Sequence, residues 1–354
     1  PAFLHEIQEG AGGMRWSTSV AGDRVLRLPA GLQIRQRDIR VALALIGVLA
    51  ALVLLALGTG SISVPLDVFW GGALSPDQHY ALYDIRIPRI VVGFTAGCSV
   101  ALSGAILQSV TRNALADPGI LGLSQGAIVS VMLVLVLAPS APQWQVFLCA
   151  LAGGCAVALV LFMLTGRERG NSLALLLMGI AVESVLSSVS GILLLYMPPE
   201  VSQSLSEWML GTLFQASPRN MFWMLPLFLA CFVGVLWAGP PTRALELGDE
   251  LAQSIGEEVG RSRPRLLLFA VVCNTAAVAV VGPLTLLGVM APFMAASGAR
   301  ARLYLSALTG GVMVVLADTV LRGIAHDRGL PIGVIIILTG VPLAVILMRR
   351  HHVA

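Results

Sequence analysis

The sequence predicts an all-α polytopic membrane protein with about ten transmembrane helices. Of its 354 residues, 57% are hydrophobic and 12% are charged, whereas soluble domains have about 45–50% apolar and about 25% charged residues. The mean hydropathy is +0.87. The apolar residues also form runs of about 20, the length that an α-helix needs to cross a bilayer. This composition excludes a soluble globule, a disordered chain and a nucleic-acid-binding protein.

Charged residues and turn-forming residues divide the apolar sequence into ten predicted spans. They lie near residues 41–59, 90–110, 119–138, 145–165, 172–196, 220–238, 264–282, 283–299, 303–321 and 331–349. Only Gly282-Pro283 separates the seventh span from the eighth. The first apolar run has the full length of a span and lacks a small-residue cleavage site, so no secretory signal is expected.

The segment before the first span, residues 1–39, is polar, basic and without clear periodicity. We expect it to form a mobile cytoplasmic extension. Residues 40–354 then form the transmembrane domain, and their longest inward loop covers about residues 240–264.

The distribution of arginine predicts the orientation of the spans. All 22 basic residues are arginine, and 17 of them fall on the cytoplasmic side if both termini are cytoplasmic. Basic residues near span ends are retained on that side. Five arginines are left on the outside, and they require an explanation. They are Arg86, Arg89, Arg219, Arg322 and Arg328.

The sequence lacks the residues that several classes of catalytic and metal-binding site require. The chain has no lysine, and a Walker A loop needs one to bind the nucleotide phosphates, so any ATP must be bound by another subunit. The five cysteines form no CxxC pair and there is no HExxH motif, which argues against a metal site or an intramembrane metalloenzyme.

Two acidic residues within predicted spans are candidate functional groups, because charges at membrane depth are costly. Asp318 precedes Arg322 by four residues, so the two can pair on a helix. Glu183 either lines a pathway or hydrogen-bonds to Ser187 or another helix. A secondary transporter driven by protons or sodium, which is the main rival function, would use one of these acids as its carrier.

The inward loop contains a short amphipathic helix with two distinct surfaces. Leu247, Leu251 and Ile255 form an apolar face, Gly248 and Ala252 offer small residues for close approach by another protein, and Gly256 ends the helix. Two interpretations remain open, a helix that lies on the membrane and a helix that contacts a partner.

Helix-breaking pairs interrupt both halves of the chain, at Pro118-Gly119 and again at Gly282-Pro283 and Ala291-Pro292. Breaks at membrane depth are tolerated where they line a cavity. Paired breaks are typical of transporters with inverted repeats, but tight turns have the same signature.

A series of short motifs runs in a fixed order through residues 40–350. They are Arg86-Ile87-Pro88-Arg89, Ser103-Gly104-Ala105 with Gln108, Arg112 to Gly122, Leu177 to Ala181, Trp208 to Gly211, Leu247-Gly248 with Ile255-Gly256, Gly282-Pro283 with Ala291-Pro292, Ala317-Asp318, and Leu330 to Pro342. In this order they resemble the FecCD family, the permease subunits of bacterial ABC importers for ferric siderophores, haem and vitamin B12.

The resemblance implies a type II importer permease in the bacterial inner membrane. Such a permease pairs with a second copy or a paralogue and has its substrate path at the dimer interface. Two ATPase subunits on the cytoplasmic side bind ATP and Mg, and a substrate-binding protein docks outside. The chain itself would bind no cofactor and catalyse no reaction. An iron–siderophore complex is the expected substrate, because siderophore systems dominate the family; haem and cobalamin are the alternatives.

The resemblance also assigns roles to the outer arginines. Arg86, Arg89 and Arg322 match the residues that bind acidic side chains on the binding protein, a task that suits the guanidinium group. Binding of anionic lipid headgroups is the alternative.

On the cytoplasmic side, the resemblance makes residues 246–256 the segment that couples to the ATPase. Asn113 and Leu115, together with Asn171 and Ser172, match positions that close the path. Glu183 is placed on a helix that lines it.

The chain departs from many relatives at three positions. Phe293 and Ala296 replace a histidine and an arginine, and Gly329 replaces a glutamate. These changes remove polar contacts near the eighth predicted span and an acid on the outer side.

Overall fold

The structure is a computed structural model that describes residues 15–18, 24–27, 33–60, 62, 74–165, 172–295, 299–325 and 331–351. It divides into two compact units, residues 1–47 and residues 48–354.

The first unit contains an antiparallel sheet of three short strands in the order β1-β2-β3. These are β1 (Arg15–Thr18), β2 (Arg24–Arg27) and β3 (Gln33–Arg35). The register pairs Trp16 with Leu26, and Leu26 with Ile34. The sequence did not predict these strands, and the expectation that residues 1–39 form a mobile cytoplasmic extension stays a prediction. Strands of three or four residues are too short for their alternation to be recognised.

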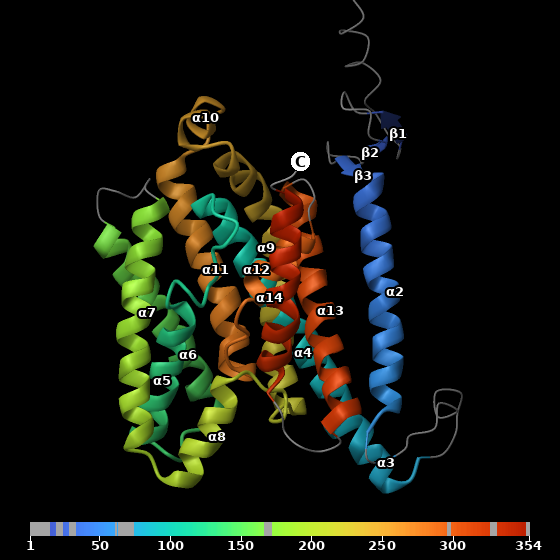
Figure 1. Cartoon of the computed structure of the whole chain (residues 1–354), viewed down its shortest axis with the longest axis vertical. Coiled ribbons are helices and arrows are strands. Elements are labelled where there is room, and N and C mark those ends of the chain that lie inside the picture. The colour runs from blue at the N-terminus through green and yellow to red at the C-terminus, as the bar shows by residue number, and fades with distance from the viewer. Residues whose placement is uncertain are drawn as a thin grey trace, which may run out of the picture. The chain divides into compact units, whose positions relative to one another are not determined.

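The second unit is helical (Figure 1). Its elements, counting the whole of α2, are α2 (Gln36–Gly58), α3 (Pro76–Tyr80), η2 (Ala81–Arg86), α4 (Ile87–Thr111), α5 (Leu123–Leu137), α6 (Gln143–Thr165), α7 (Ser172–Leu195), α8 (Pro199–Met209), α9 (Pro218–Glu246), α10 (Asp249–Ser254), α11 (Val259–Val281), α12 (Leu287–Met294), α13 (Ala299–Ala325) and α14 (Ile332–His351). The predicted all-α membrane fold is confirmed.

Among the described residues, seven helical segments are long and apolar enough to cross a membrane. One of them is continuous from α3 to the end of α4. The other six lie in α2, α6, α7, α9, α11 and α13. Two further predicted spans, the third and the tenth, correspond to α5 with 15 residues and α14 with 20 residues.

The eighth predicted span, residues 283–299, is wrong. The helix there, α12, has 8 residues, and at a rise of 1.5 Å per residue it is only about 12 Å long. Gly282 (φ 80°) ends α11, and Leu286 adopts a left-handed conformation at φ 65° just before α12. The apolar composition of this segment reflects burial inside the bundle, because Leu287 to Pro292 are all buried.

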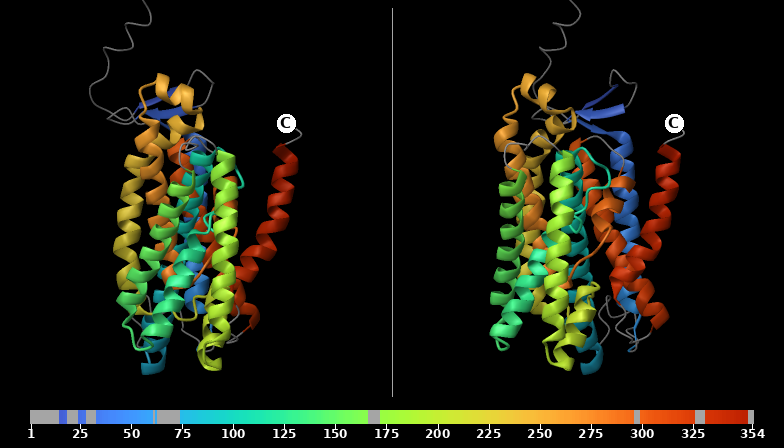
Figure 2. Two further views of the ribbon diagram at one scale, coloured as in Figure 1. Left: turned by 90° about the vertical axis from the view of Figure 1, so that its left-hand side faces the viewer. Right: turned by 60° about the vertical axis from the view of Figure 1, so that its left-hand side comes forward.

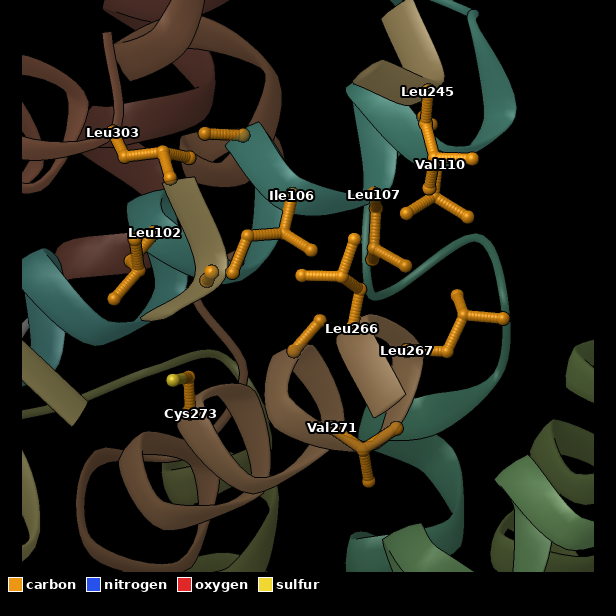
Figure 3. Packing of buried hydrophobic residues seen from close by; sticks show 14 of the residues in the cluster. Leu102, Ile106, Leu107, Val110, Leu245, Leu266, Leu267, Val271, Cys273 and Leu303 are labelled. Atoms are coloured by element: carbon orange, nitrogen blue, oxygen red, sulfur yellow. The ribbon is translucent and has the colours of Figure 1, made fainter. Parts of the chain in front are cut away.

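Helix α4 is the core of the second unit, and nearly all its side chains from Val92 to Thr111 are buried. It packs against α9, α11, α12 and α13. Figure 3 shows leucines and other apolar side chains of α4 meeting those of α9, α11 and α13. The labelled residues are Leu102, Ile106, Leu107, Val110, Leu245, Leu266, Leu267, Val271, Cys273 and Leu303.

Two glycine pairs bring the backbones of these helices together. A Cβ atom on Gly97 would collide with the carbonyl of Gly310 in α13, and one on Gly104 with the carbonyl of Gly288 in α12. Small residues permit such close helix approach within membranes. The glycines of α4 therefore fix how near α12 and α13 can lie.

The helices of this unit run between two ends (Figures 1 and 2). The short helix α10 lies at one, which we call the α10 end. Helices α3 and α8 lie at the other, which we call the α8 end.

Candidate functional site

The short helix α10 projects from the α10 end between α9 and α11 (Figure 1). Gly248 (φ 100°) and Gly256 (φ 89°) flank it. Glycine adopts these dihedral angles without the steric cost that a side chain would add, so the chain can reverse sharply on both sides of α10. The predicted loop of residues 240–264 is shorter than expected, because α9 continues to Glu246 and α11 begins at Val259.

Leu247, Leu251 and Ile255 are all exposed, Leu251 at 57%, and we call them the exposed apolar row of α10. The prediction that one helix carries all three is wrong for Leu247, because it is the C-cap of α9 and Gly248 separates it from α10. The predicted small-residue surface is wrong, because Ala252 is fully buried in the core cluster. Ala252 therefore anchors α10 to the bundle, and the leucine and isoleucine side chains are the part that a partner can reach.

A turn follows the C-terminal end of α4 and begins the connection to α5. Its first residue, Arg112, is the C-cap of α4 in a left-handed conformation at φ 51°. The Asn113 side chain accepts a hydrogen bond from the Leu115 backbone N–H at 2.9 Å, and Leu115 is exposed. The predicted turn is present, and its role in closing a path stays a prediction. Of the other two residues given this role, Asn171 is outside the described residues and Ser172 is the first residue of α7.

Asp117, in the same connection, is a buried carboxylate that sequence reasoning left without a role. Its Oδ1 accepts a hydrogen bond from the Gly119 N–H at 2.7 Å. Its Oδ2 faces Gly288 at the start of α12 so closely that a Cβ there would lie 2.9 Å away. Burial raises the pKa of Asp117 from 3.8 to about 6, although the Gly119 hydrogen bond opposes the shift.

This shift predicts a pH dependence of stability. The folded chain holds the Asp117 proton more tightly than the unfolded chain, so the contribution is complete below pH 3.8 and is lost as pH rises through about 6. An upward shift of about two units corresponds to at most about 3 kcal/mol. We expect Asp117→Asn to flatten the fall in unfolding temperature between pH 4 and 7, measured in detergent. Glu250→Gln, which changes an exposed carboxylate of α10, should keep the wild-type profile; an unchanged profile in Asp117→Asn would contradict this account.

Arg86, Arg89 and Arg322, the three arginines predicted to dock the binding protein, lie at the α8 end, and two of them bind Asp318. Arg89 Nε lies 2.7 Å from Asp318 Oδ1, and Arg322 Nη2 lies 3.0 Å from Asp318 Oδ2. The predicted Asp318–Arg322 pair is therefore confirmed. Arg86 is only 4% exposed and donates hydrogen bonds to the carbonyls of Leu57 and Ile62.

These arginines hold helix ends together. Arg86 binds the carbonyl of Leu57, and Arg322 Nη1 donates to the carbonyl of Ala56 at 3.0 Å. Carbonyls in the last turn of a helix have no partner within it, and both arginines satisfy carbonyls at the end of α2. Arg86, Arg89 and Arg322 therefore have little exposure and make contacts inside the bundle, and their docking to a binding protein stays a prediction.

Glu183 is half-buried on α7 beside the start of α5. A Cβ on Gly122 would lie 3.1 Å from the Glu183 backbone nitrogen, so the two helices touch at this point. Several large apolar side chains of α7 are exposed, for example Leu177, Val185 and Ile192. The placement of Glu183 on a path stays a prediction.

Comparison with known proteins decides the family. The model of the FecCD transport family matches residues 48–350. The chain belongs to the FecCD transport family. It is 31% identical over 321 residues to the Fe(3+)-citrate import system permease protein YfmE of Bacillus subtilis, covering 89% of this chain and 96% of that one.

Two further proteins place this FecCD chain among its relatives. It is 33% identical to the hemin transport system permease protein HmuU of Yersinia pestis, covering 86% of this chain and 94% of that one. A solved structure of a metal-chelate type ABC transporter in an inward-facing conformation has the same fold, with a TM-score of 0.78 and 21% identity. It covers 88% of this chain and 99% of that one.

The FecCD chain also contains a pocket of about 500 Å³ that sequence reasoning did not find. It lies among α5, α6, α8, α9 and α11, and its lining includes Phe147, Trp208 and Trp223. Asn220 supplies a polar group and hydrogen-bonds to the Gln143 side chain. Trp208 belongs to one of the recognised motifs, but the residues of the pocket come from five helices and two connections and share no sequence pattern.

The departures from relatives fall partly within the structure. Phe293 is a half-buried residue of α12, whereas Ala296 and Gly329 are outside the described residues.

Proposed function

We propose that this chain is the membrane-spanning permease subunit of an ATP-binding-cassette importer. It would carry an iron–siderophore complex across the bacterial inner membrane. The observation that carries the proposal is the exposed apolar row of α10, at one end of a FecCD chain, around a short helix flanked by two glycine turns. An exposed apolar row at the end of a membrane bundle fits a partner protein.

In this proposal the α10 end and both termini are cytoplasmic. A loaded binding protein docks outside, and ATPase subunits that hold ATP and Mg close inside. Helix α10 passes that motion to the bundle, which alternates between two states that the ligands bind unequally. The permease pairs with a second copy or a related chain, and the exposed apolar face of α7 supports such pairing. No bond of the substrate is made or broken.

The iron chelate is favoured over other substrates because a relative that covers most of the chain is a ferric citrate permease. Haem is the second candidate, supported by the hemin permease relative; cobalamin is the third. The test reconstitutes the transporter in liposomes with its ATPase and binding protein. Uptake of ferric siderophore, ferric citrate, haem and cobalamin is then measured with ATP and with ADP.

We expect ATP-dependent uptake of a ferric chelate. Uptake of haem or cobalamin alone would replace the substrate assignment. Uptake that needs no ATPase and is abolished by a proton or sodium ionophore would instead establish the secondary-transporter alternative, with Glu183 or Asp318 as the carrier. Docking of the binding protein by Arg86, Arg89 and Arg322 is part of this proposal, and of the three the side chains of Arg89 and Arg322 are the more exposed.

The proposed gate makes a separate prediction. In a chain without its native cysteines, Cys at Asn113 or Leu115 should cross-link to the same position of the second permease subunit. The yield should change with nucleotide, and the cross-link should block uptake, because the exposed turn would narrow the path in one of the two states. Gln253→Cys on α10 is the exposed control. Failure to cross-link in every nucleotide state would contradict the gate.

A further inference from the structure

The first residue of α10, Asp249, joins three elements at the α10 end. Its carboxylate accepts two hydrogen bonds from Arg263 of α11, with Nη2 at 2.7 Å from Oδ1 and Nη1 at 3.1 Å from Oδ2. Its Oδ1 also lies 3.9 Å from Nη2 of Arg112, the C-cap of α4. One carboxylate therefore connects α10, α11 and the turn that follows α4.

The two ion pairs differ in character. The Arg263 side chain is 9% exposed and its fork-shaped contact is the strong, geometrically defined kind. The Arg112 side chain is 42% exposed and its contact is longer, so this pair is weak and can open and close. Asp249–Arg263 is suited to be a fixed anchor, and Asp249–Arg112 is suited to be an exchangeable contact.

Arg112 is well placed to pass on a displacement. It directly precedes Asn113 in the turn after α4, and its left-handed backbone at φ 51° is a conformation that a non-glycine residue rarely adopts. Its Nη1 also lies against Gly248, where a Cβ would be 3.1 Å away. We call Gly248 the pivot of α10, because its backbone turns the chain just before that helix. Arg112 thus lies against both the pivot and Asp249, the first residue of α10.

A second carboxylate lies on the other side of that pivot. Glu246, the last residue of α9, accepts a hydrogen bond from Ser109 of α4 at 2.7 Å and one from Arg302 of α13 at 3.0 Å. Arg302 donates in turn to Gln108 of α4 at 2.7 Å. The α9 side of the pivot is therefore tied to the bundle, and motion at Gly248 would act mainly on α10 and Asp249.

We propose that Asp249 is the positioning residue that transmits the movement of α10 to the turn at residues 112–115. Movement of α10 carries the Asp249 carboxylate toward or away from Arg112, and Arg112 shifts the turn that contains Asn113 and Leu115. This inference rests on the proposed importer function. It names the residue that couples α10 to the turn at residues 112–115.

The test measures substrate transported per ATP hydrolysed in reconstituted transporter with its ATPase and binding protein. Asp249→Asn keeps the size of the side chain and removes its charge; Arg112→Gln removes only the exchangeable contact. We expect both variants to bind the ATPase and hydrolyse ATP while transport per ATP falls about tenfold, within the usual range of coupling between sites.

The matched control is Arg261→Gln. Arg261 pairs with Glu258 at 2.6 Å in the same cytoplasmic segment, but that pair is highly exposed and joins neighbouring residues only. It should leave transport per ATP unchanged. Nucleotide-dependent cross-linking of Asn113→Cys is a second readout, which should become independent of nucleotide in Arg112→Gln.

Wild-type transport per ATP in both Asp249→Asn and Arg112→Gln would overturn the inference, while ATP-driven uptake by the parent protein would leave the proposed function standing. Absence of ATP-driven uptake in the parent would overturn the function itself. If Asp249→Asn elutes as aggregated protein in size-exclusion chromatography, the exposed Arg112→Gln variant decides.

Discussion

Leu251→Asp should abolish association of this chain with its ATPase while leaving the membrane domain folded. Leu251 lies in the exposed apolar row of α10 with Leu247 and Ile255. A carboxylate placed at the centre of an apolar contact would be buried without a partner, which is among the most costly changes in an interface. We expect co-purification with the ATPase to fall at least about tenfold, the equivalent of about 1.4 kcal/mol.

The control for this prediction is Gln253→Asp, which changes an exposed residue of the same helix outside the apolar row. It should bind the ATPase like the parent protein. Size-exclusion profiles of both variants report folding, which should be unaffected since both side chains are exposed. Normal ATPase binding by Leu251→Asp and by Ile255→Asp would show that α10 is not the contact surface.

Asp318→Asn should cause a large loss of folded protein. The Asp318 side chain is 2% exposed and its two oxygens bind Arg89 and Arg322. Removing the charge leaves two arginines uncompensated inside the bundle, and breaking a buried ion pair in this way typically costs about 3–5 kcal/mol. The measurement is the yield and thermal stability of the monodisperse protein in detergent.

Two further variants sharpen this test. Glu258→Gln breaks the exposed pair with Arg261 and should change stability little, because exposed pairs contribute only about 0.2–1 kcal/mol. Arg322→Glu should resemble Asp318→Asn, since it sets two carboxylates side by side. If Arg322→Glu folds normally and loses only its affinity for the binding protein, the arginine is a docking residue and its structural role is refuted.

The ion pairs at the α8 end differ from those at the α10 end in how exposed they are and in how easily they can open. At the α8 end, the arginines satisfy carbonyls of α2 and the Asp318 carboxylate, so their charge is used inside the chain. At the α10 end, Arg112 and Asp249 keep substantial exposure and one long contact. Only the second arrangement can exchange partners at low cost, which suits a moving junction.

The sequence by itself determined the membrane fold, because a bilayer imposes its requirement locally. Each crossing helix must satisfy its own backbone hydrogen bonds and present about 20 apolar residues. A run of apolar residues of that length can be recognised in a single segment of the sequence. The apolar residues Leu247, Leu251 and Ile255 were also recognisable as a set, since their spacing of four residues follows the helical period. The ordered motifs gave the family for the same reason, as local strings.

Only the tertiary structure decided which of these residues are buried and what they bind. The segment 283–299 has the composition of a span, but whether its apolar side chains meet lipid or α4 depends on Gly104 and Gly288 approaching each other from distant parts of the chain. Ala252 is the buried residue of α10, and Arg86 donates to the carbonyls of Leu57 and Ile62. The link between Asp249, Arg263 and Arg112 likewise joins residues of three elements. Burial and charge pairing depend on contacts between distant segments, and hydropathy and periodicity along one segment contain no information about them.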